Sequence, residues 1–419
     1  MAKKKILIAN RRYFPSTGPE RYMFNISALL EHDGFEVVPF SVKREQNLPT
    51  PYSDYFVNPP YGENVLYYQD AKLSLWQKLS IFTKCIYSLE AKRKMTHIIK
   101  DQNISLVYLL GIVNDISPSV IDACKETGIP VVMRLSDYNI LCGSYHFLRD
   151  QNLCRECVEK SPFRCTKYKC VKNQFMTSFA RSVSMYLHNI LNIYDYVSAF
   201  VCPCSFMKSS MEMAGFPADK IFQINSFLDP KDYEPCYEHD GYALYFGRVS
   251  HEKGIEYLLE AKSLIKTSLP LYIVGGYNDE QYYNSLKKYC VDHEINDVKF
   301  IDFMKGDELK KMIRRATFVV APSIWPDNSP MAVLEALASG KPVIGCDIGG
   351  ITDQIADNCG YRVPPKNSAA LAEKMSFLWS DNTAVTAMGK NARRHFELSF
   401  SPDQHYSRLR ALFDRCLQQ

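Results

Sequence analysis

Two loops in the second half of the chain carry charged residues at spacings that suit phosphate and hydroxyl groups. In the first loop, Gly247-Arg248 and Lys253-Gly254 follow a predicted strand at 242–246 and precede a predicted helix at 255–265. Backbone N–H groups at a helix N-terminus attract anions, and two cations beside glycines can neutralise them. This loop is therefore predicted to bind a diphosphate. An ordinary solvated loop between a strand and a helix is the alternative.

The second loop places a carboxylate on either side of a helix start. A predicted strand ends near Ala321, and a helix begins after Pro330, with Ser329 as its expected cap. Asp327 precedes that helix, and Glu335 lies within it among apolar residues. Because a carboxylate in apolar surroundings usually has a partner, a ligand at the helix start could touch both carboxylates. The alternative is a capping loop followed by a surface glutamate.

The elements that must position these loops alternate between strand and helix. A chain of 419 residues exceeds the usual size of one hydrophobic core. A polar segment at 225–237, with Pro230 and Pro235, interrupts the alternation and is the expected linker. The fold class is therefore predicted to be α/β with two parallel-sheet domains, whose ligands bind beyond the carboxyl ends of the strands. The predicted strands are 5–9, 35–40, 106–110, 130–135, 242–246, 269–274, 298–301, 318–321 and 342–346, and the predicted helices are 20–32, 118–127, 255–265, 279–293 and the stretch after 384.

Composition narrows the class of protein. The chain is 46% hydrophobic and 23% charged, as folded globular proteins are. The 50 Lys and Arg exceed the 46 Asp and Glu by only 4, which argues against nucleic acid as the main ligand. Residues 1–232 hold 28 basic and 22 acidic side chains, so the first half is the basic one. The apolar run after Lys3-Lys4-Lys5 is too short for a signal peptide, and we expect a cytoplasmic protein.

Taken together, the two loops resemble the retaining nucleotide-sugar glycosyltransferases of family 4, which have the GT-B fold. The resemblance spans nearly the whole chain. Its motifs are Gly18 in an N-terminal glycine loop, Gly247-Arg248 and Lys253-Gly254 in the donor-phosphate motif, Asp327 through Glu335 in the E-x7-E signature, and 340–344 with 349–351 downstream.

The resemblance implies a role for each matching residue. Arg248 and Lys253 would hold the donor diphosphate, and Glu335 would accept hydrogen bonds from the ribose diol. Asp327 stands where the family usually has glutamate, in contact with the transferred sugar. The backbone amides around Ser329, Pro330 and Met331 would face the sugar and the phosphate.

The resemblance also implies a domain plan and a mechanism. Residues 1–232 would bind the acceptor and 233–395 the donor, and the helix at 396–419 would pack back on the N-terminal domain. Transfer would retain the anomeric configuration, and the departing phosphate would help deprotonate the acceptor. The sequence contains no Asp-x-Asp pattern, so transfer is expected to need no metal ion. Relatives often have His-Asp where this chain has Ser136-Asp137, so Asp137 and the nearby His146 are further candidates, with a turn-forming carboxylate and a structural histidine as the alternatives.

A cysteine cluster lies in a long basic insertion at 142–172. Its spacing, Cys154-x2-Cys157-x7-Cys165-x4-Cys170 after Cys142, is typical of a four-thiolate zinc site. Because four thiolates leave no open position, such a zinc would be structural. Reduced thiols or adventitious disulfides are the alternatives.

The segment 73–94 alternates apolar residues with lysines. It is interpreted as an amphipathic core helix with a solvated basic face, and docking on an anionic membrane is the alternative.

The resemblance also implies the substrates. The expected donor is a UDP- or GDP-linked hexose or N-acetylhexosamine, and the expected acceptor is a saccharide or a polyprenyl-linked saccharide. The expected role is bacterial surface polysaccharide synthesis at the inner face of the membrane. Two other classes stay open: a dinucleotide-dependent oxidoreductase, disfavoured because Gly275-Gly276 is a poor dinucleotide motif, and a non-catalytic, zinc-stabilised relative.

Overall fold

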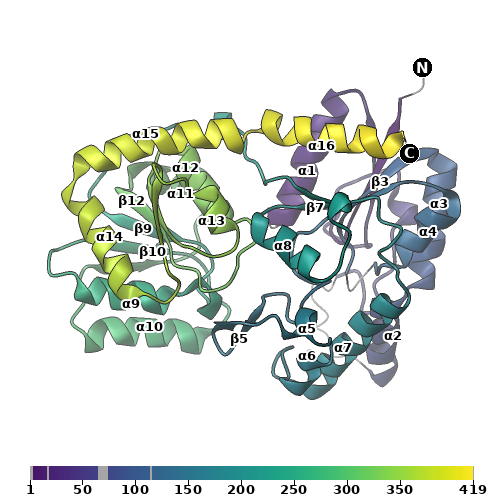
Figure 1. Ribbon diagram of the computed structural model, residues 1–419, viewed down its shortest axis with the longest axis horizontal. Coiled ribbons are helices and arrows are strands. Elements are labelled where there is room, and N and C mark those ends of the chain that lie inside the picture. The colour runs from purple at the N-terminus through teal and green to yellow at the C-terminus, as the bar shows by residue number, and fades with distance from the viewer. Residues whose placement is uncertain (1–2, 17, 65–73, 114–115, 419) are drawn as a thin grey trace.

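The computed structural model describes residues 3–16, 18–64, 74–113 and 116–418. Within these residues the chain forms two six-stranded parallel sheets, each covered by helices on both faces (Figure 1). The first sheet has the order β2-β1-β3-β4-β7-β8 and the second the order β11-β10-β9-β12-β13-β14. The strands of the first sheet are β1 (Lys5–Asn10), β2 (Glu36–Phe40), β3 (Ile104–Gly111), β4 (Val131–Arg134), β7 (Ala199–Cys202) and β8 (Ile221–Gln223). Those of the second are β9 (Ala243–Phe246), β10 (Leu271–Val274), β11 (Val298–Ile301), β12 (Phe318–Ala321), β13 (Val343–Cys346) and β14 (Gly360–Val363).

The central strands of both sheets are mostly apolar because both faces of each sheet are covered. Ile6, Leu7 and Ile8 of β1 point to alternate faces, and all three are fully buried. The same holds for Val319 and Val320 of β12. The predicted fold class, two Rossmann-like α/β domains, is therefore confirmed.

The covering helices follow the strands in chain order. In the first half they are α1 (Gly18–His32), α2 (Leu75–Ile86), α3 (Leu89–Gln102), α4 (Ser119–Thr127), α5 (Glu156–Glu159), α6 (Arg164–Lys167), α7 (Phe175–Ile190) and α8 (Ser205–Met213). In the second half they are α9 (Ile255–Leu264), α10 (Glu280–Asp292), α11 (Gly306–Arg315), α12 (Met331–Ala338), α13 (Gly350–Gln354), α14 (Ser368–Ser380), α15 (Asn382–Ser399) and α16 (Pro402–Leu417).

Helix α16 returns to the first sheet, as the resemblance implied. In Figure 1, α15 and α16 run one after the other along the top edge and link the two halves. Leu409 and Phe413 of α16 are buried in the cluster that contains Ile6 and Tyr108. His405 lies 2.8 Å from the Tyr22 hydroxyl through Nε2 and 2.6 Å from the Asn225 carbonyl oxygen through Nδ1.

The insertion folds into a short hairpin, β5 (Leu148–Arg149) and β6 (Asn152–Leu153), followed by α5 and α6. The hairpin tip contacts the second half of the chain. Gln151 accepts a hydrogen bond from the Tyr257 hydroxyl at 2.9 Å, and Asn152 accepts one from Lys366 at 3.0 Å. The insertion thus bridges the two halves.

Two local predictions are wrong. The segment 73–94 is not one helix: α2 ends at Ile86, and Ser88 caps α3 by accepting a hydrogen bond from the Ala91 amide at 3.1 Å. Residue 73 and the lysine before it lie outside the described residues. The sequence also predicts that Cys202 and Cys204 are both strand residues, but only Cys202 is, at the end of β7, because Cys204 immediately precedes α8. Among the described helices, none is long and apolar enough to span a bilayer.

Candidate active site

The first loop lies at the carboxyl ends of β9 and β10, where a parallel sheet binds ligands. Arg248 follows β9 with about half of its side chain exposed, and its guanidinium lies 3.6 Å from Glu252. Gly254 has φ +65°, and a Cβ there would lie 2.2 Å from the Pro322 carbonyl oxygen. Only glycine fits this close approach between the start of α9 and the loop after β12. The approach fixes the position of the neighbouring Lys253.

Lys253 joins the two predicted loops. Its ammonium lies 2.5 Å from the Asp327 carboxylate and 5.4 Å from the centre of the Trp325 ring. The side chains of Lys253 and Asp327 are 17% and 12% exposed, so the pair is largely shielded from water. The cation and the carboxylate, which lie 74 residues apart, therefore meet in one site.

The start of α12 faces the first half of the chain. A Cβ at Gly18 would lie 3.9 Å from the Met331 side chain, which places the N-terminal glycine loop against the first turn of α12. Ser329 does not cap this helix, contrary to expectation: the residue before the first turn is Pro330, and no side chain caps it. The Ser329 hydroxyl instead accepts a hydrogen bond from Gln354 at 3.2 Å. An uncapped helix start leaves N–H groups available to an anion.

Glu335 is buried one turn further along α12, 8% exposed. Its carboxylate accepts a hydrogen bond from the Tyr233 hydroxyl at 3.1 Å and lies 3.6 Å from the Arg21 guanidinium. Burial raises the pKa of Glu335, and the Arg21 charge and the Tyr233 hydrogen bond oppose that shift. The expectation that this carboxylate has partners is confirmed, but neither partner was predicted. Arg21 lies only three residues after Gly18, which is a signal too weak to find without the structure.

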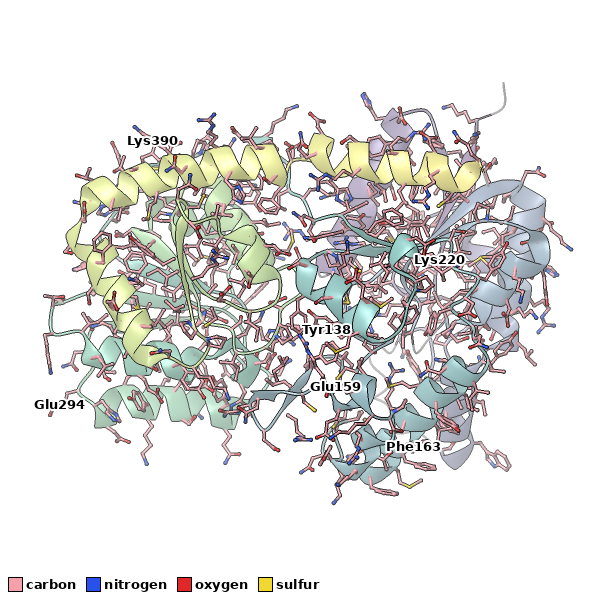
Figure 2. The ribbon with its side chains drawn as sticks, in the orientation of Figure 1. Tyr138, Glu159, Phe163, Lys220, Glu294 and Lys390 are labelled. Atoms are coloured by element: carbon pink, nitrogen blue, oxygen red, sulfur yellow. The ribbon has the colours of Figure 1, made fainter. Side chains whose placement is uncertain are left out.

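The first sheet contributes a rigid wall to the same place. The Tyr138 hydroxyl donates to the Pro326 carbonyl oxygen at 2.7 Å, and the Asn328 amide donates to the Leu135 carbonyl oxygen at 3.0 Å. Figure 2 labels Tyr138 at this junction between the halves. Because these bonds flank Asp327, the loop that carries it is tied to both sheets.

Asp137 does not reach the paired loops. It is exposed, and its carboxylate accepts hydrogen bonds from the Asn139 amide at 2.9 Å and from the Asn139 side chain at 2.6 Å. This geometry is a turn held by its own carboxylate, the alternative that the sequence left open. Ser136 is half-buried beside it.

His146 comes closer to the paired loops than Asp137. The insertion carries it to an edge-on contact with the Trp325 ring, with centres 5.0 Å apart. Burial lowers the pKa of His146, and the Glu252 charge opposes this effect. A neutral imidazole thus borders the loops of Arg248 and Lys253.

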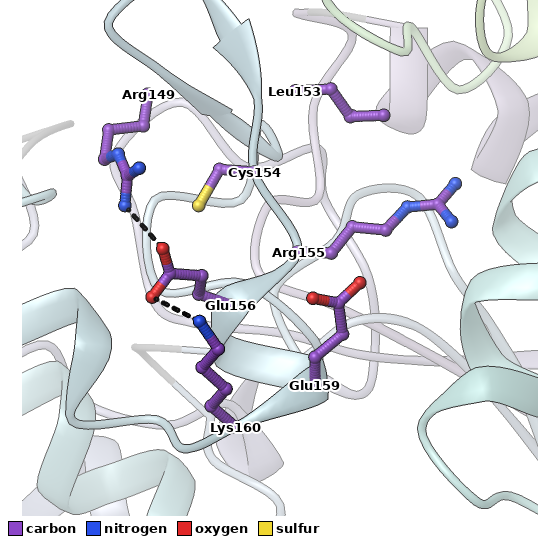
Figure 3. Close-up of a pocket in the computed structure, with 7 residues that line it drawn as sticks. All are labelled: Arg149, Leu153, Cys154, Arg155, Glu156, Glu159 and Lys160. Atoms are coloured by element: carbon purple, nitrogen blue, oxygen red, sulfur yellow. Dashed lines mark hydrogen bonds and ion pairs between the residues drawn. The ribbon is translucent and has the colours of Figure 1, made fainter.

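The structure does not support the predicted zinc site. Among the described residues, no group of three or more His, Cys, Asp or Glu side chains is placed to hold a metal ion. Cys165 is buried against Gly143, where a Cβ would lie 2.4 Å from its sulfur, and it hydrogen-bonds Cys170. Cys154 instead lines an open hollow of about 490 Å³ (Figure 3). Burial raises the pKa of Cys157 to about 12, which favours its thiol form.

The residues that line this hollow all belong to the insertion, and three of its charged side chains form ion pairs with one another. Figure 3 shows Arg149 and Lys160 converging on Glu156, at 3.1 Å and 3.6 Å. The pair between Arg149 and Glu156 thus joins the hairpin to α5 within the insertion.

Comparison with known proteins gives a family match for the second half of the chain. Residues 231–395 match one protein family, glycosyl transferases group 1. The uncharacterized glycosyltransferase MJ1607 of Methanocaldococcus jannaschii is 27% identical over 241 residues, which are 53% of this chain and 61% of that protein. O-antigen chain mannosyltransferase C of Escherichia coli is 29% identical over 167 residues, 39% of this chain and 44% of that protein. The chain thus spans about half the length of these curated relatives.

Solved structures match over the whole chain. Anabaena Alr3699/HepE in complex with UDP has a TM-score of 0.64 at 16% identity, over 98% of this chain and 100% of that one. A glycosyltransferase from Rickettsia africae ESF-5 has a TM-score of 0.69 at 17% identity, over 100% of both chains. At such identities the likeness shows the fold. The chain as a whole therefore has the GT-B fold, and its residues 231–395 match the glycosyl transferases group 1 family.

Proposed function

We propose that this protein transfers a hexose or N-acetylhexosamine from a nucleoside diphosphate sugar to a saccharide acceptor, with retention of configuration. One observation carries the proposal: Lys253, Asp327 and the uncapped start of α12 converge at the carboxyl ends of the second sheet, beside Arg248. A UDP complex of a protein with the same fold supports a nucleotide donor.

The residues divide the work by charge. Cleavage of the donor puts negative charge on the leaving diphosphate, and Arg248, Lys253 and the α12 N-terminus would stabilise it. Glu335, buried near the same helix start, would accept the ribose hydroxyls. Asp327 would contact the transferred sugar, and the departing phosphate would take the acceptor proton, so that no metal ion is needed.

The acceptor side is the first sheet. It belongs to the basic part of the chain, with 28 basic and 22 acidic residues in 1–232, which suits an anionic or phospholipid-linked saccharide. Relatives named for O-antigen mannosyl transfer and amylovoran biosynthesis support a role in polysaccharide synthesis. We place that synthesis at the inner face of the membrane as part of the proposal.

The test is a transfer assay on the full chain. A panel of UDP- and GDP-sugars with saccharide acceptors is screened with and without EDTA, and the anomeric configuration of the product is read by NMR. Lys253→Ala is compared with Lys305→Ala, an exposed lysine of the same domain. We expect Lys253→Ala to lower kcat/KM about 100-fold or more, because it removes a positive charge that stabilises the transition state. Lys305→Ala should leave kcat/KM unchanged.

Three outcomes would overturn the proposal. Equal losses in both variants would show that Lys253 has no special role. Thermal stabilisation by NAD or NADP but by no sugar nucleotide would instead favour the oxidoreductase. Nucleotide binding without turnover on any acceptor would indicate the non-catalytic relative.

A further inference from the structure

Helix α7 buries mainly polar side chains and exposes its aromatic ones. Its buried side chains are mostly polar and include Ser178, Ser182 and His188. Ser182 donates to the Pro162 carbonyl oxygen at 2.9 Å, Ser178 accepts from the Val171 amide at 3.0 Å, and His188 lies 2.8 Å from the Ile86 carbonyl oxygen. Polar bonds therefore help to attach α7 to the protein, and its aromatic side chains, Phe175, Phe179 and Tyr186, are exposed.

The outer side of α7 forms a continuous apolar surface, which we call the aromatic face. Phe175 and Phe179 stack one turn apart, with ring centres 6.2 Å apart. Phe163, from the loop before α6, lies 6.4 Å from Phe179 and 5.4 Å from Tyr186. Met176 is 70% exposed. The exposed members of the aromatic face are Phe163, Phe175, Met176, Phe179, Tyr186, Ile190 and Leu191.

Such a surface needs an explanation, because a folded chain rarely leaves a contiguous group of large apolar side chains in water. The spacing 175, 179, 186 and 190 is that of one helix face. In an ordinary surface helix this face would be turned inward. Here the inner positions hold serines, so the apolar face is available to a partner outside the chain.

The charge around the aromatic face indicates which kind of partner would bind there. Residues 154–192 contain seven Lys and Arg and two Asp and Glu, a net charge of +5. The rest of the chain then has 43 basic and 44 acidic residues, a net charge of −1. The positive charge of the protein is thus concentrated in the segment that carries the aromatic face. Its exposed lysines include Lys160, Lys167, Lys169 and Lys172.

Exposed aromatic and aliphatic side chains flanked by lysines match the interface of an anionic bilayer, where rings enter the headgroup region and lysines meet lipid phosphates. A second copy of the chain is a poorer partner, because two faces of charge +5 repel each other. We propose that the aromatic face docks the protein on an anionic membrane surface.

The location of the face fits this role. Figure 2 shows Phe163 at the lower edge of the molecule, away from Lys390 on α15 at the upper edge. Helix α2 packs against α7. It is the first half of the segment 73–94, for which the sequence left membrane docking open as the alternative to a core helix. The insertion that precedes α7 also carries His146 to Trp325. Docking would therefore hold the junction of the two sheets beside the membrane, where a lipid-linked acceptor lies. This last step alone rests on the proposed function.

Vesicle binding of the full chain tests the proposal without nucleotide or acceptor. Co-sedimentation is measured with phosphatidylcholine vesicles and with vesicles containing half phosphatidylglycerol. We expect binding to the anionic vesicles only, and its loss at high salt. The triple variant Phe175→Ser, Met176→Ser, Phe179→Ser should lower the partition coefficient at least tenfold. The matched control Val291→Ser, Phe303→Ser, Leu398→Ser alters similarly exposed apolar residues of the second domain and should leave it unchanged.

The lysines are tested separately, because the electrostatic and the apolar contributions to membrane binding are independent. Lys167→Gln with Lys169→Gln should weaken binding about 25-fold, at about fivefold for each charge near the surface. Lys288→Gln with Lys305→Gln, exposed lysines of the second domain, should have no effect. Circular dichroism melts identify any variant that is unfolded, and the lysine pair keeps the test valid if the apolar triple variant fails to fold.

Three results would overturn the proposal: equal binding to neutral and anionic vesicles, unchanged binding in both sets of variants, or no vesicle binding together with a dimer that the triple variant dissociates. The last would assign the aromatic face to self-association. Transfer to a soluble acceptor is measured in parallel. If the wild type binds vesicles but shows no transfer to a soluble acceptor, that result contradicts the proposed function and leaves the membrane-docking proposal standing.

Discussion

The ion pair between Lys253 and Asp327 gives a quantitative prediction. Asp327→Asn keeps the shape of the side chain and removes its charge, which leaves the Lys253 ammonium without its 2.5 Å partner. Breaking a fully buried pair costs about 3–5 kcal/mol. Because these side chains are 17% and 12% exposed, water offsets part of that cost, and we expect a loss of about 2 kcal/mol.

A loss of that size lowers the Tm of a domain of this length by about 4–8 °C, measured by differential scanning calorimetry. A diphosphate can replace the missing carboxylate. Asp327→Asn should therefore bind UDP more tightly than the wild type, by up to about 30-fold if the full 2 kcal/mol is recovered. Transfer should nevertheless fall, because the proposed role of Asp327 in contacting the sugar needs its charge.

The control is Glu373→Gln, which breaks the exposed pair with Lys374 at 2.7 Å. Exposed pairs contribute about 0–1 kcal/mol, so its Tm should shift little and its affinity for UDP should not change. The reasoning fails if Asp327→Asn melts like the wild type, or if calorimetric titration shows that it binds UDP more weakly.

Three further predictions follow from the buried groups and the glycines. Burial raises the pKa of Glu335, so the wild type loses stability as pH rises from about 4.5 through that raised pKa. Glu335→Gln should therefore be more stable than the wild type at pH 7 in urea titrations, while binding UDP more weakly; equal stability at pH 7 would contradict this. Burial lowers the pKa of His405 to about 3, so stability should fall by about 1.4 kcal/mol per unit as pH drops below about 6.5. His405→Gln should remove that slope between pH 6.5 and 5, as measured by thermal melts, and a slope that persists would point to other groups. Gly254→Ala should lower the free energy of unfolding by more than the roughly 1 kcal/mol expected for Gly128→Ala. Both glycines have φ near +70°, but only Gly254 has a carbonyl oxygen 2.2 Å from the new Cβ. Equal losses in denaturant titrations would show that the loop after β12 moves to accommodate the methyl group.

Much of the fold could be predicted because its elements are local patterns. The strands β11 and β12 were predicted at their observed bounds, since each is a short run dominated by apolar, strand-forming residues between polar turns. Strand β14 was missed because Arg362 interrupts its pattern, and the break between α2 and α3 was missed because Ser88 looked like one polar residue within a helix. In both places the local pattern of apolar residues does not decide the structure. A hydrogen bond to the Ser88 side chain begins α3, and pairing with β13 makes 360–363 a strand.

By itself, the sequence determined which groups are candidates for the site: Arg248, Lys253, Asp327 and Glu335, each close to a glycine turn or a helix start. Only the tertiary structure decided which of them meet. Arg21 reaches Glu335, Lys253 pairs with Asp327, and α7 turns its aromatic side outward. The physical reason is that a helix or turn depends on neighbours a few residues away, whereas these contacts depend on how two sheets and an insertion pack, a balance of burial and polar bonds summed over the whole chain.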